Sequence, residues 1–457
     1  MQIDFNIKPV DLKTKLADFW KLSGEKILDI EKHYDASKGA PVFTVNGKYS
    51  SKGWTEWTQG FQYGSALLQF EATEDEQFLQ IGKQNTLDKM APHLSHVGVH
   101  DHGFNNISTY GNLLRFMEDG LIPFNNWEKE FYQLALKLSG TVQANRWTTT
   151  PEGGYIYSFN GPHSLFVDTM RSVRILMLSH FMGHEFKGEN DQVINLLERA
   201  LQHIQVTSKY NIYYNEGRDK YDDWGRTAHE AIFNTNDGNF RAPNTQQGFS
   251  GFTTWTRGLS WAICGFAEEL EFLQKVPADQ FPDSISKESI MKTLEKGARA
   301  TCDFFIENTA KDGITYWDTG APNLHKLGDY KSVNSDPYND FEPIDSTAAA
   351  ISAQGLLRLG KVLGDHKYTQ AGLTSAKTML SEPYLSTEPH HQGILLHSIY
   401  HEPNGWDNVP KGQKIACHES SMWGDYHMRE LAIYLDKMVK GKPDYAFFNC
   451  LEDFRNK

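Results

Sequence analysis

Two kinds of helical pattern alternate along the chain. In one kind, apolar residues recur on a single helix face and polar residues occupy the rest, which is typical of a helix at a protein surface. The other kind is apolar nearly all round, which is typical of a helix buried on every side. The first kind covers residues 12–34, 75–90, 127–146, 191–208, 286–308 and 366–380. The second kind covers residues 58–70, 104–117, 163–182, 256–272, 345–363 and 421–435.

This alternation predicts an all-α fold. The apolar helices can form an inner ring while the amphipathic helices surround it with their polar faces outward, which is an (α/α)6 barrel. Strands are difficult to fit because β-branched residues rarely alternate with polar ones. No Pro/Gly/Ser-rich linker marks a boundary, so residues 1–457 are expected to form a single barrel domain. Two separate all-helical domains are the alternative.

The loops that lead into the inner helices of such a barrel open at one end, so polar residues from several loops meet around one cavity. Each apolar helix here follows a segment rich in Gly, Asn, His, Trp or Asp. We therefore expect the functional site at that end. Residues 211–255 and 312–343 are long for connections in a compact helical domain, which indicates functional loops or short strands of their own.

Charge and hydropathy exclude two classes of partner. The net charge of −13 argues against a nucleic acid, which needs a basic face, but leaves an anionic small molecule possible. No apolar run reaches the length of a membrane span, and the N-terminus has no signal-peptide apolar region. We expect a cytoplasmic protein, or a periplasmic one if a signal peptide has been removed, and monomer and dimer both stay open. Cys264 and Cys302 lie in apolar helical patterns and no CxxC occurs, which favours buried thiols.

Asp168 is the first candidate for chemistry. It lies in the first turns of the apolar helix predicted over 163–182, where a carboxylate is costly unless it is paired or its pKa rises. One interpretation is a salt bridge to Arg171, or a first-turn acid favoured by the helix dipole. The other is a catalytic acid at the mouth of the barrel. Asp101, just before the helix over 104–117, is either an N-cap or a second carboxylate that faces Asp168.

Further polar and aromatic residues precede the inner helices. Trp54 and Trp57 are candidates for stacking on a sugar, with a core role equally open. His96, His100 and His102 are close in sequence, but their spacing does not match a zinc site and no HExxH occurs, so no metal is predicted. Arg257 is badly placed for the helix dipole at a helix start, which points to a carboxylate partner. The remaining candidates are His229, Gln246, Gln247, Trp255, Trp261 and Ser421.

The ordered set of motifs resembles the unsaturated glucuronyl hydrolases, glycoside hydrolase family 88, and the related unsaturated rhamnogalacturonyl hydrolases. The matching pieces are WTQGF, HDHGF, the helix that carries Asp168, AHEAIFNTNDG, TQQGF followed by WTRG, DSTAAA and SMWGDY. They occur in the same order and cover roughly residues 57–435. Two departures stand out, because the His of the Thr-His-Gln-Gly motif is Gln246 here and a residue that is usually polar is Leu259.

The resemblance implies a role for each matching residue. Asp168 matches the general acid/base of the family, and Asp101 matches the carboxylate that faces it. The substrate-binding residues implied are His229, Gln247, Trp255 and Arg257, to which Trp57, Gln246, Trp261 and Ser421 are added from their places in the loops. We expect Arg257 to bind the uronate carboxylate, with a tie between loops through Glu230 or Asp237 as the alternative.

The chemistry implied is hydration of a vinyl ether. Substrates of the family are oligosaccharides that end in a 4,5-unsaturated uronic acid made by a lyase, and no metal or organic cofactor is required. One group must donate a proton and later remove one from water, so its pKa must be raised. Two alternatives stay open, since one fold hosts many functions. They are a glycosidase or uronate lyase that acts on saturated sugars, and a non-catalytic sugar-binding protein.

Overall fold

The computed structural model describes residues 1–53 and 56–454, and its helices alternate between an inner and an outer layer. The inner layer consists of α2 (Gln59–Thr73), α5 (His102–Asn106), the π-helical turn η4 (Ile107–Gly111), α6 (Asn112–Glu118), α8 (Thr169–Ser172), α9 (Arg174–Phe181), α11 (Thr256–Lys275), α13 (Ser346–Leu363) and α15 (Met422–Lys440). The outer layer consists of α1 (Lys13–His33), α3 (Glu76–Lys89), α7 (Asn126–Asn145), α10 (Leu196–Tyr210), α12 (Lys287–Asn308) and α14 (His366–Met379), and the short α4 (Ala91–Leu94) follows α3.

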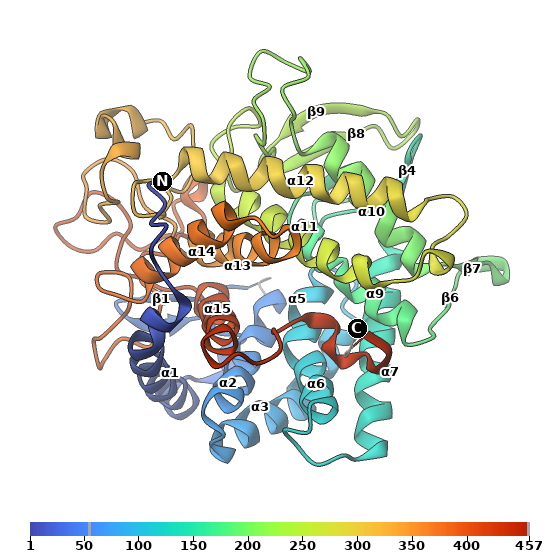
Figure 1. Ribbon diagram of the computed structural model, residues 1–457, viewed down its shortest axis with the longest axis horizontal. Helices are drawn as coiled ribbons and strands as arrows, with labels where there is room; N and C mark the ends of the chain where they lie inside the picture. The colour runs from blue at the N-terminus through green and yellow to red at the C-terminus, as the bar shows by residue number, and fades with distance from the viewer. Residues whose placement is uncertain (54–55, 455–457) are drawn as a thin grey trace.

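The inner layer is a closed ring. Helix α2 packs against α5, α5 against α8, α8 against α11, α11 against α13, α13 against α15, and α15 against α2 again. Each outer helix packs on the inner helix next to it in sequence, as α3 does on α2 and α14 on α13. In Figure 1, α1 and α7 accordingly lie at the periphery. The predicted (α/α)6 barrel is confirmed.

Polar side chains fix the starts of many helices. Outer helices α3, α7, α12 and α14 begin after Asp75, Asn125, Ser286 and Asp365, and each of these side chains accepts a hydrogen bond from a backbone N–H of the first turn. These caps satisfy N–H groups that have no partner within the helix. The predicted starts of these helices therefore agree with the structure to within one residue.

The prediction of one helix over residues 163–182 is wrong for the first part of that segment. Residues Ser164–Phe166 form strand β5, which pairs with β8 (Glu230–Phe233), and β8 pairs with β9 (Phe240–Asn244). A short apolar run fits a buried strand as well as a buried helix, so periodicity alone does not separate them. Among the described residues, three two-stranded sheets accompany this one: β1 (Phe43–Val45) with β2 (Lys48–Ser50), β3 (Trp147–Thr150) with β4 (Gly153–Ile156), and β6 (Phe186–Lys187) with β7 (Val193–Ile194).

The two long loops differ in structure. The loop over 211–255 contains strands β8 and β9, as expected, whereas the loop over 312–343 contains 3-10 turns such as η7 (Leu324–Leu327) and η8 (Tyr330–Ser332). The C-terminal segment closes one end of the barrel, where Phe448 stacks on Phe272 of α11 and Phe454 packs on Phe181 of α9 (Figure 1). The site must therefore lie at the opposite end, where α9 and α11 begin.

The expectations about the cysteines and about membrane spans can be compared with the structure. The four cysteines are free and buried, which confirms the expected buried thiols. No helix among the described residues is both long and apolar enough to span a bilayer.

Candidate active site

A short strand pair brings Asp168 beside His229. Strand β5 ends at Phe166, which lies opposite Glu230 in the antiparallel pair with β8. The backbone N–H of Val167 donates to the carbonyl oxygen of His229 at 2.9 Å. Helix α8 starts directly afterwards, so the Asp168 carboxyl group faces the imidazole, with 3.7 Å between Asp168 Oδ1 and His229 Nε2.

Asp101 reaches the same region from the loop before α5. The N–H of Gly103 donates to Ser172 Oγ at 3.0 Å, and the Ser172 hydroxyl donates to the His100 carbonyl oxygen at 2.9 Å, which fastens this loop to α8. A Cβ at Gly103 would lie 2.0 Å from the Ser172 carbonyl oxygen, so the glycine of the HDHGF motif permits the close approach. The Asp101 side chain makes no capping hydrogen bond, and neither does that of Asp168. The N-cap alternative for Asp101 is therefore wrong.

The salt-bridge alternative for Asp168 is also wrong. The guanidinium of Arg171 donates to Glu268 at 2.9 Å and to Glu430 at 2.6 Å, inside the barrel. All three side chains are buried. Arg171 thus neutralises a carboxylate pair in the core, and Asp168 is left for another role.

Burial raises the pKa of the carboxyl groups of Asp168 and Asp101. Desolvation raises the pKa of Asp168 from 3.8 to about 7, against the charge of Arg257, which lowers it. Desolvation raises the pKa of Asp101 to about 8; the nearby charge of Asp168 adds to this, and the charge of Arg146 opposes it. Near neutral pH the pair can hold a proton and also release it. An acid/base catalyst needs this property.

His229 is a neutral N–H donor aimed at the carboxyl pair. Its Nδ1 accepts hydrogen bonds from the backbone N–H groups of Gln246 (3.1 Å) and Gln247 (3.4 Å), so the ring proton is on Nε2. Burial lowers the pKa of His229 to about 3, which keeps the ring uncharged. The rings of Phe166 and Trp255 hold it from two sides, at centroid distances of 4.3 Å and 4.6 Å.

Buried polar atoms without a protein hydrogen-bond partner gather at this site. Asp168 Oδ1, His229 Nε2 and Gln246 Oε1 belong to this group, and so do both ring nitrogens of His100. His100 Nε2 lies 3.7 Å from Asp101 Oδ1. Because buried polar groups in proteins are almost always paired, such a cluster indicates a place where a polar ligand supplies the partners.

A cavity of 410 Å³ lies beside the loop that leads to Asp101. It is lined by Glu56, Trp57, His96, Gly98, Val99, Phe159 and Gln246. Phe159 stacks on His100 at 5.7 Å, and the backbone N–H of Gln246 donates to His229, so two walls of the cavity contact the histidines that lie beside Asp101 and Asp168. The volume is that of a small-ligand site. Trp57 is half-buried and open to the cavity, while Trp54 lies outside the described residues.

Arg257 already has a carboxylate partner within the protein. Its guanidinium donates to Asp345 Oδ2 at 2.6 Å, to the carbonyl oxygens of Ile399 and Tyr400, and to Gln247 Oε1 at 3.1 Å. Four of its five N–H groups are thereby used, and the residue is only 3% exposed. The geometry favours the alternative role, a tie between loops, although the partner is Asp345 and neither Glu230 nor Asp237. Contact with a substrate carboxylate is not supported.

Other predicted binding residues are also enclosed by protein. Trp261 packs between Phe104 and His427 inside the barrel, at 4.7 Å and 4.9 Å. The hydroxyl of Ser421 accepts from the N–H of Gly424 at 3.1 Å and so caps α15, which gives it a structural role in place of the predicted contact with substrate. Among the predicted binding residues, only Trp57 and Gln246 line the cavity. His229, Gln247 and Trp255 are not among its lining residues.

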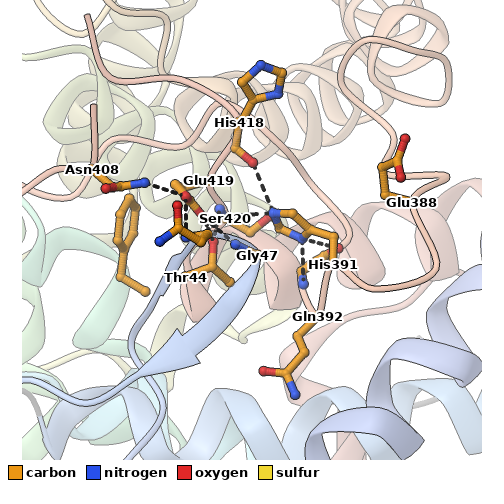
Figure 2. Close-up of polar contacts among 12 residues, drawn as sticks. Thr44, Gly47, Glu388, His391, Gln392, Asn408, His418, Glu419 and Ser420 are labelled. Carbon is orange, nitrogen blue, oxygen red and sulfur yellow. Dashed lines mark hydrogen bonds and ion pairs between the residues drawn. The ribbon is translucent and has the colours of Figure 1, made fainter. Parts of the chain in front are cut away.

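The loop before α15 anchors the β1–β2 hairpin. Figure 2 shows Glu419 between Thr44, Gly47 and Asn408. The Glu419 carboxylate accepts from the Thr44 hydroxyl at 2.5 Å, the Gly47 N–H at 3.2 Å and the Asn408 amide at 2.7 Å. His391 Nε2 is 3.0 Å from the His418 carbonyl oxygen. This polar cluster holds two distant chain segments together and does not contact the carboxyl pair.

Sequence reasoning missed three residues near the pair. Arg146 directly follows α7, and its guanidinium donates to the carbonyl oxygens of Val97, Tyr157 and Ser158, which lie next to the cavity residues Gly98 and Phe159 in the chain. His100 was considered only as a metal ligand, and Phe159 carried no motif. Only the tertiary structure could identify Arg146, because it lies 45 residues from Asp101 in the sequence and no motif links the two residues.

The closed ring of helical hairpins, with two enclosed carboxyl groups at the end where its inner helices begin, defines an (α/α)6-barrel protein. Solved structures confirm this fold class. The structure of an unsaturated glucuronyl hydrolase from Bacillus sp. GL1 aligns with a TM-score of 0.68 at 20% identity, over 92% of this chain and 97% of that chain. An unsaturated glucuronyl hydrolase specific for heparin aligns with a TM-score of 0.69 at 19% identity, over 95% and 99%.

Curated proteins confirm the resemblance that the motifs predict. An unsaturated glucuronyl hydrolase of Formosa agariphila is 24% identical over 380 residues, which is 82% of this chain and 78% of the relative. An unsaturated glucuronyl hydrolase of Bacillus sp. GL1 is 24% identical over 87% of this chain and 90% of the relative. An unsaturated chondroitin disaccharide hydrolase of Streptococcus pyogenes is 23% identical over 88% and 85%. No protein-family model matches the chain.

Proposed function

We propose that this protein is a glycoside hydrolase that removes a terminal 4,5-unsaturated uronic acid from lyase-derived oligosaccharides, as a step in polysaccharide degradation. The observation that carries the proposal is the pair of Asp168 and Asp101, two enclosed carboxyl groups whose pKa values lie near neutrality. The similarity to proteins named unsaturated glucuronyl hydrolase and unsaturated chondroitin disaccharide hydrolase supports the same reaction class.

Asp168 is the proposed acid/base. Its carboxylic acid donates a proton to C4 of the unsaturated sugar, and positive charge develops at C5 and the ring oxygen. Water adds to C5 and gives a proton to the Asp168 carboxylate, which restores the acid. The hemiketal that forms at C5 then opens, and C1 releases the next sugar as an alcohol. One water molecule is consumed, and the reaction requires no metal ion or organic cofactor.

Asp101 and His229 are proposed to tune this acid. Asp101 holds the other proton of the carboxyl pair, and its charge state influences how readily Asp168 gives up its own proton. The Nε2–H of His229 is a fixed neutral donor that can bind a substrate oxygen next to Asp168 without lowering the pKa of the acid as a cation would. Its orientation is set by the two backbone N–H groups on Nδ1.

The cavity is the proposed place of the sugar. Trp57 offers an aromatic face, and the side chain of Gln246 offers a polar group whose Oε1 has no protein partner. Residues 1–457 are proposed to work as one catalytic domain, a proposal supported by a large apolar core cluster whose members run from Ile7 to Phe454. A cytoplasmic location, or a periplasmic one after removal of a signal peptide, stays a proposal.

The test is a panel of unsaturated disaccharides produced by lyases from different polysaccharides. The C4=C5 bond absorbs in the ultraviolet, so the wild type should remove that absorbance from at least one member. Asp168→Asn should reduce the rate at least about 100-fold, because a positioned acid/base typically contributes about 10²–10⁴-fold. The melting temperature of the variant serves as the folding control.

Each alternative gives a different result. A gain of absorbance from a saturated polysaccharide would identify a lyase. Release of reducing sugar with no change in absorbance would identify a glycosidase for saturated sugars. Binding without turnover would identify a sugar-binding protein. Any of these results, or an Asp168→Asn variant with more than about a tenth of wild-type turnover, would overturn the proposal.

A further inference from the structure

Helix α7 carries an apolar stripe on its solvent face. Trp127, Leu134 and Leu138 are 71%, 63% and 41% exposed. Phe131 lies between them, and its ring stacks parallel to that of Trp127, with 5.5 Å between centroids and 3° between planes. Figure 1 shows α7 at the outer edge of the barrel. The sequence predicts a polar outer face for this helix, so the stripe needs another explanation.

The stripe has the spacing of a coiled-coil seam. Trp127, Phe131, Leu134, Leu138 and Thr141 follow one another at intervals of four, three, four and three residues. This is the heptad pattern of a helix that packs along a second helix. The inner face of α7 already packs on α9 within the barrel, so the partner of the outer seam must come from outside this chain. The apolar part of the seam, from Trp127 to Leu138, is about 16 Å long at 1.5 Å per residue.

Charged residues beside the seam favour a second copy of α7 in antiparallel orientation as the partner. Glu130 directly precedes Phe131, and Lys137 directly precedes Leu138 seven residues later. The two charged residues therefore occupy the same heptad position and lie on the same edge of the seam. Among the described residues, neither side chain makes a hydrogen bond or an ion pair within the chain. If α7 packs antiparallel on α7 of a second copy, Glu130 of one copy faces Lys137 of the other, and symmetry forms this pair twice. A parallel arrangement would not bring them together.

The same antiparallel register matches the apolar residues. When Trp127 lies opposite Leu138 of the second copy, Phe131 lies opposite its Leu134, because both pairs are centred on the same point of the helix. Phe124, which is 64% exposed, lies just before the Asn125 cap of α7, and Thr141 near the other end of the helix lines an open groove of 660 Å³. The antiparallel arrangement brings these two ends of the helix toward each other.

We propose that the outer face of α7 is a self-association surface, on which two copies of this protein pack antiparallel about a two-fold axis. The interface is isologous, so it closes as a dimer and does not propagate. One seam of this length is small for a protein interface, so the dimer should be weak, with a dissociation constant in the micromolar range. The inference does not depend on the proposed enzymatic activity.

The test is sedimentation velocity of the full chain between about 1 µM and about 200 µM. The wild type should shift from the 52.1 kDa monomer toward twice that mass as concentration rises. Leu134→Glu should weaken the dimer at least about tenfold, because it places a charge at the centre of the seam. The matched control Val333→Glu changes an exposed valine (56%) on a distant loop and should behave as the wild type. Melting temperatures of all variants should be nearly equal.

A charge reversal tests the orientation. Glu130→Lys alone and Lys137→Glu alone should each weaken the dimer, while the double variant should recover it, because both interchain pairs are then reversed. A wild type that stays monomeric at the highest concentration would overturn the proposal, even if it pelleted with a polysaccharide or with lipid vesicles. A dimer insensitive to Leu134→Glu, or a double variant without recovery, would overturn it as well.

Discussion

Asp101→Asn should stabilise the protein increasingly as the pH rises. In the folded wild type, burial and the nearby Asp168 raise the pKa of Asp101 from 3.8 to about 8. Between pH 5 and pH 8 the unfolded chain has lost this proton while the folded chain keeps it. The unfolded state then binds fewer protons, so the free energy of unfolding falls as the pH rises. Asparagine has no such titratable proton, so the free energy of unfolding of the variant does not fall in this way.

The size of the effect follows from the width of the pH window. Each pH unit lowers the wild-type free energy of unfolding by about 1.4 kcal/mol, which gives about 4 kcal/mol between pH 5 and pH 8. With an unfolding entropy of about 2.1 cal/mol/K per residue, 457 residues convert this into about 4 °C in melting temperature. The quantity to measure is the melting temperature of the variant minus that of the wild type at each pH.

A matched control separates this titration from a general effect of Asp→Asn substitution. Asp237 is exposed at the surface, and its hydrogen bonds to Asn239 lower its pKa, so it is ionised in both states across the window. Asp237→Asn should therefore show no trend between pH 5 and pH 8. A melting-temperature difference for Asp101→Asn that is equally flat would refute the reasoning, because Asp101 would then be ionised in the folded protein.

In kinetics, Asp101→Asn should move the alkaline limb of kcat/KM from about pH 8 toward about pH 7, where Asp168 titrates alone.

Three further substitutions test neighbouring assignments. Arg257→Lys keeps the charge next to Asp345 but loses bonds to loop carbonyls, each worth about 1.5–3 kcal/mol, so thermal unfolding should occur several degrees lower; an unchanged melting temperature with a raised KM would restore the substrate-binding role. Ser421→Ala removes a helix cap and should cost about 1 kcal/mol in a denaturation experiment while KM stays constant; a raised KM would contradict the structural role. Arg146→Met removes the cation that lowers the pKa of Asp101, so the alkaline limb should move to higher pH, whereas Arg146→Lys should leave it in place.

The barrel could be predicted from the sequence because each of its helices is specified locally. The helix predicted over 286–308 is observed as Lys287–Asn308, since Ser286 caps its start and an apolar face runs along its length. The inner helix over 345–363 is observed as Ser346–Leu363 for the same kind of reason, with Asp345 as the cap. Caps and periodicity are short-range signals, and a single sequence contains them in full.

The detailed site could not be predicted because it depends on contacts between distant segments. The strand pairing that brings His229 beside Asp168 joins residues 64 to 68 positions apart, and a three-residue strand leaves no periodic signal. Arg257 was assigned to the substrate because its partner Asp345 lies 88 residues further along the chain. The sequence identifies which residue types are present near the mouth, but it does not reveal which of them already satisfy one another.

The central claim is that Asp168 protonates C4 of an unsaturated uronic acid. The most direct measurement is NMR of the product formed in D₂O from an unsaturated disaccharide, followed from the earliest turnover. The account predicts a single deuterium at C4, placed with one stereochemistry, in wild-type product, and no such product from Asp168→Asn within the same time. Cleavage of the disaccharide with the C4=C5 bond intact and no deuterium at C4 would contradict it.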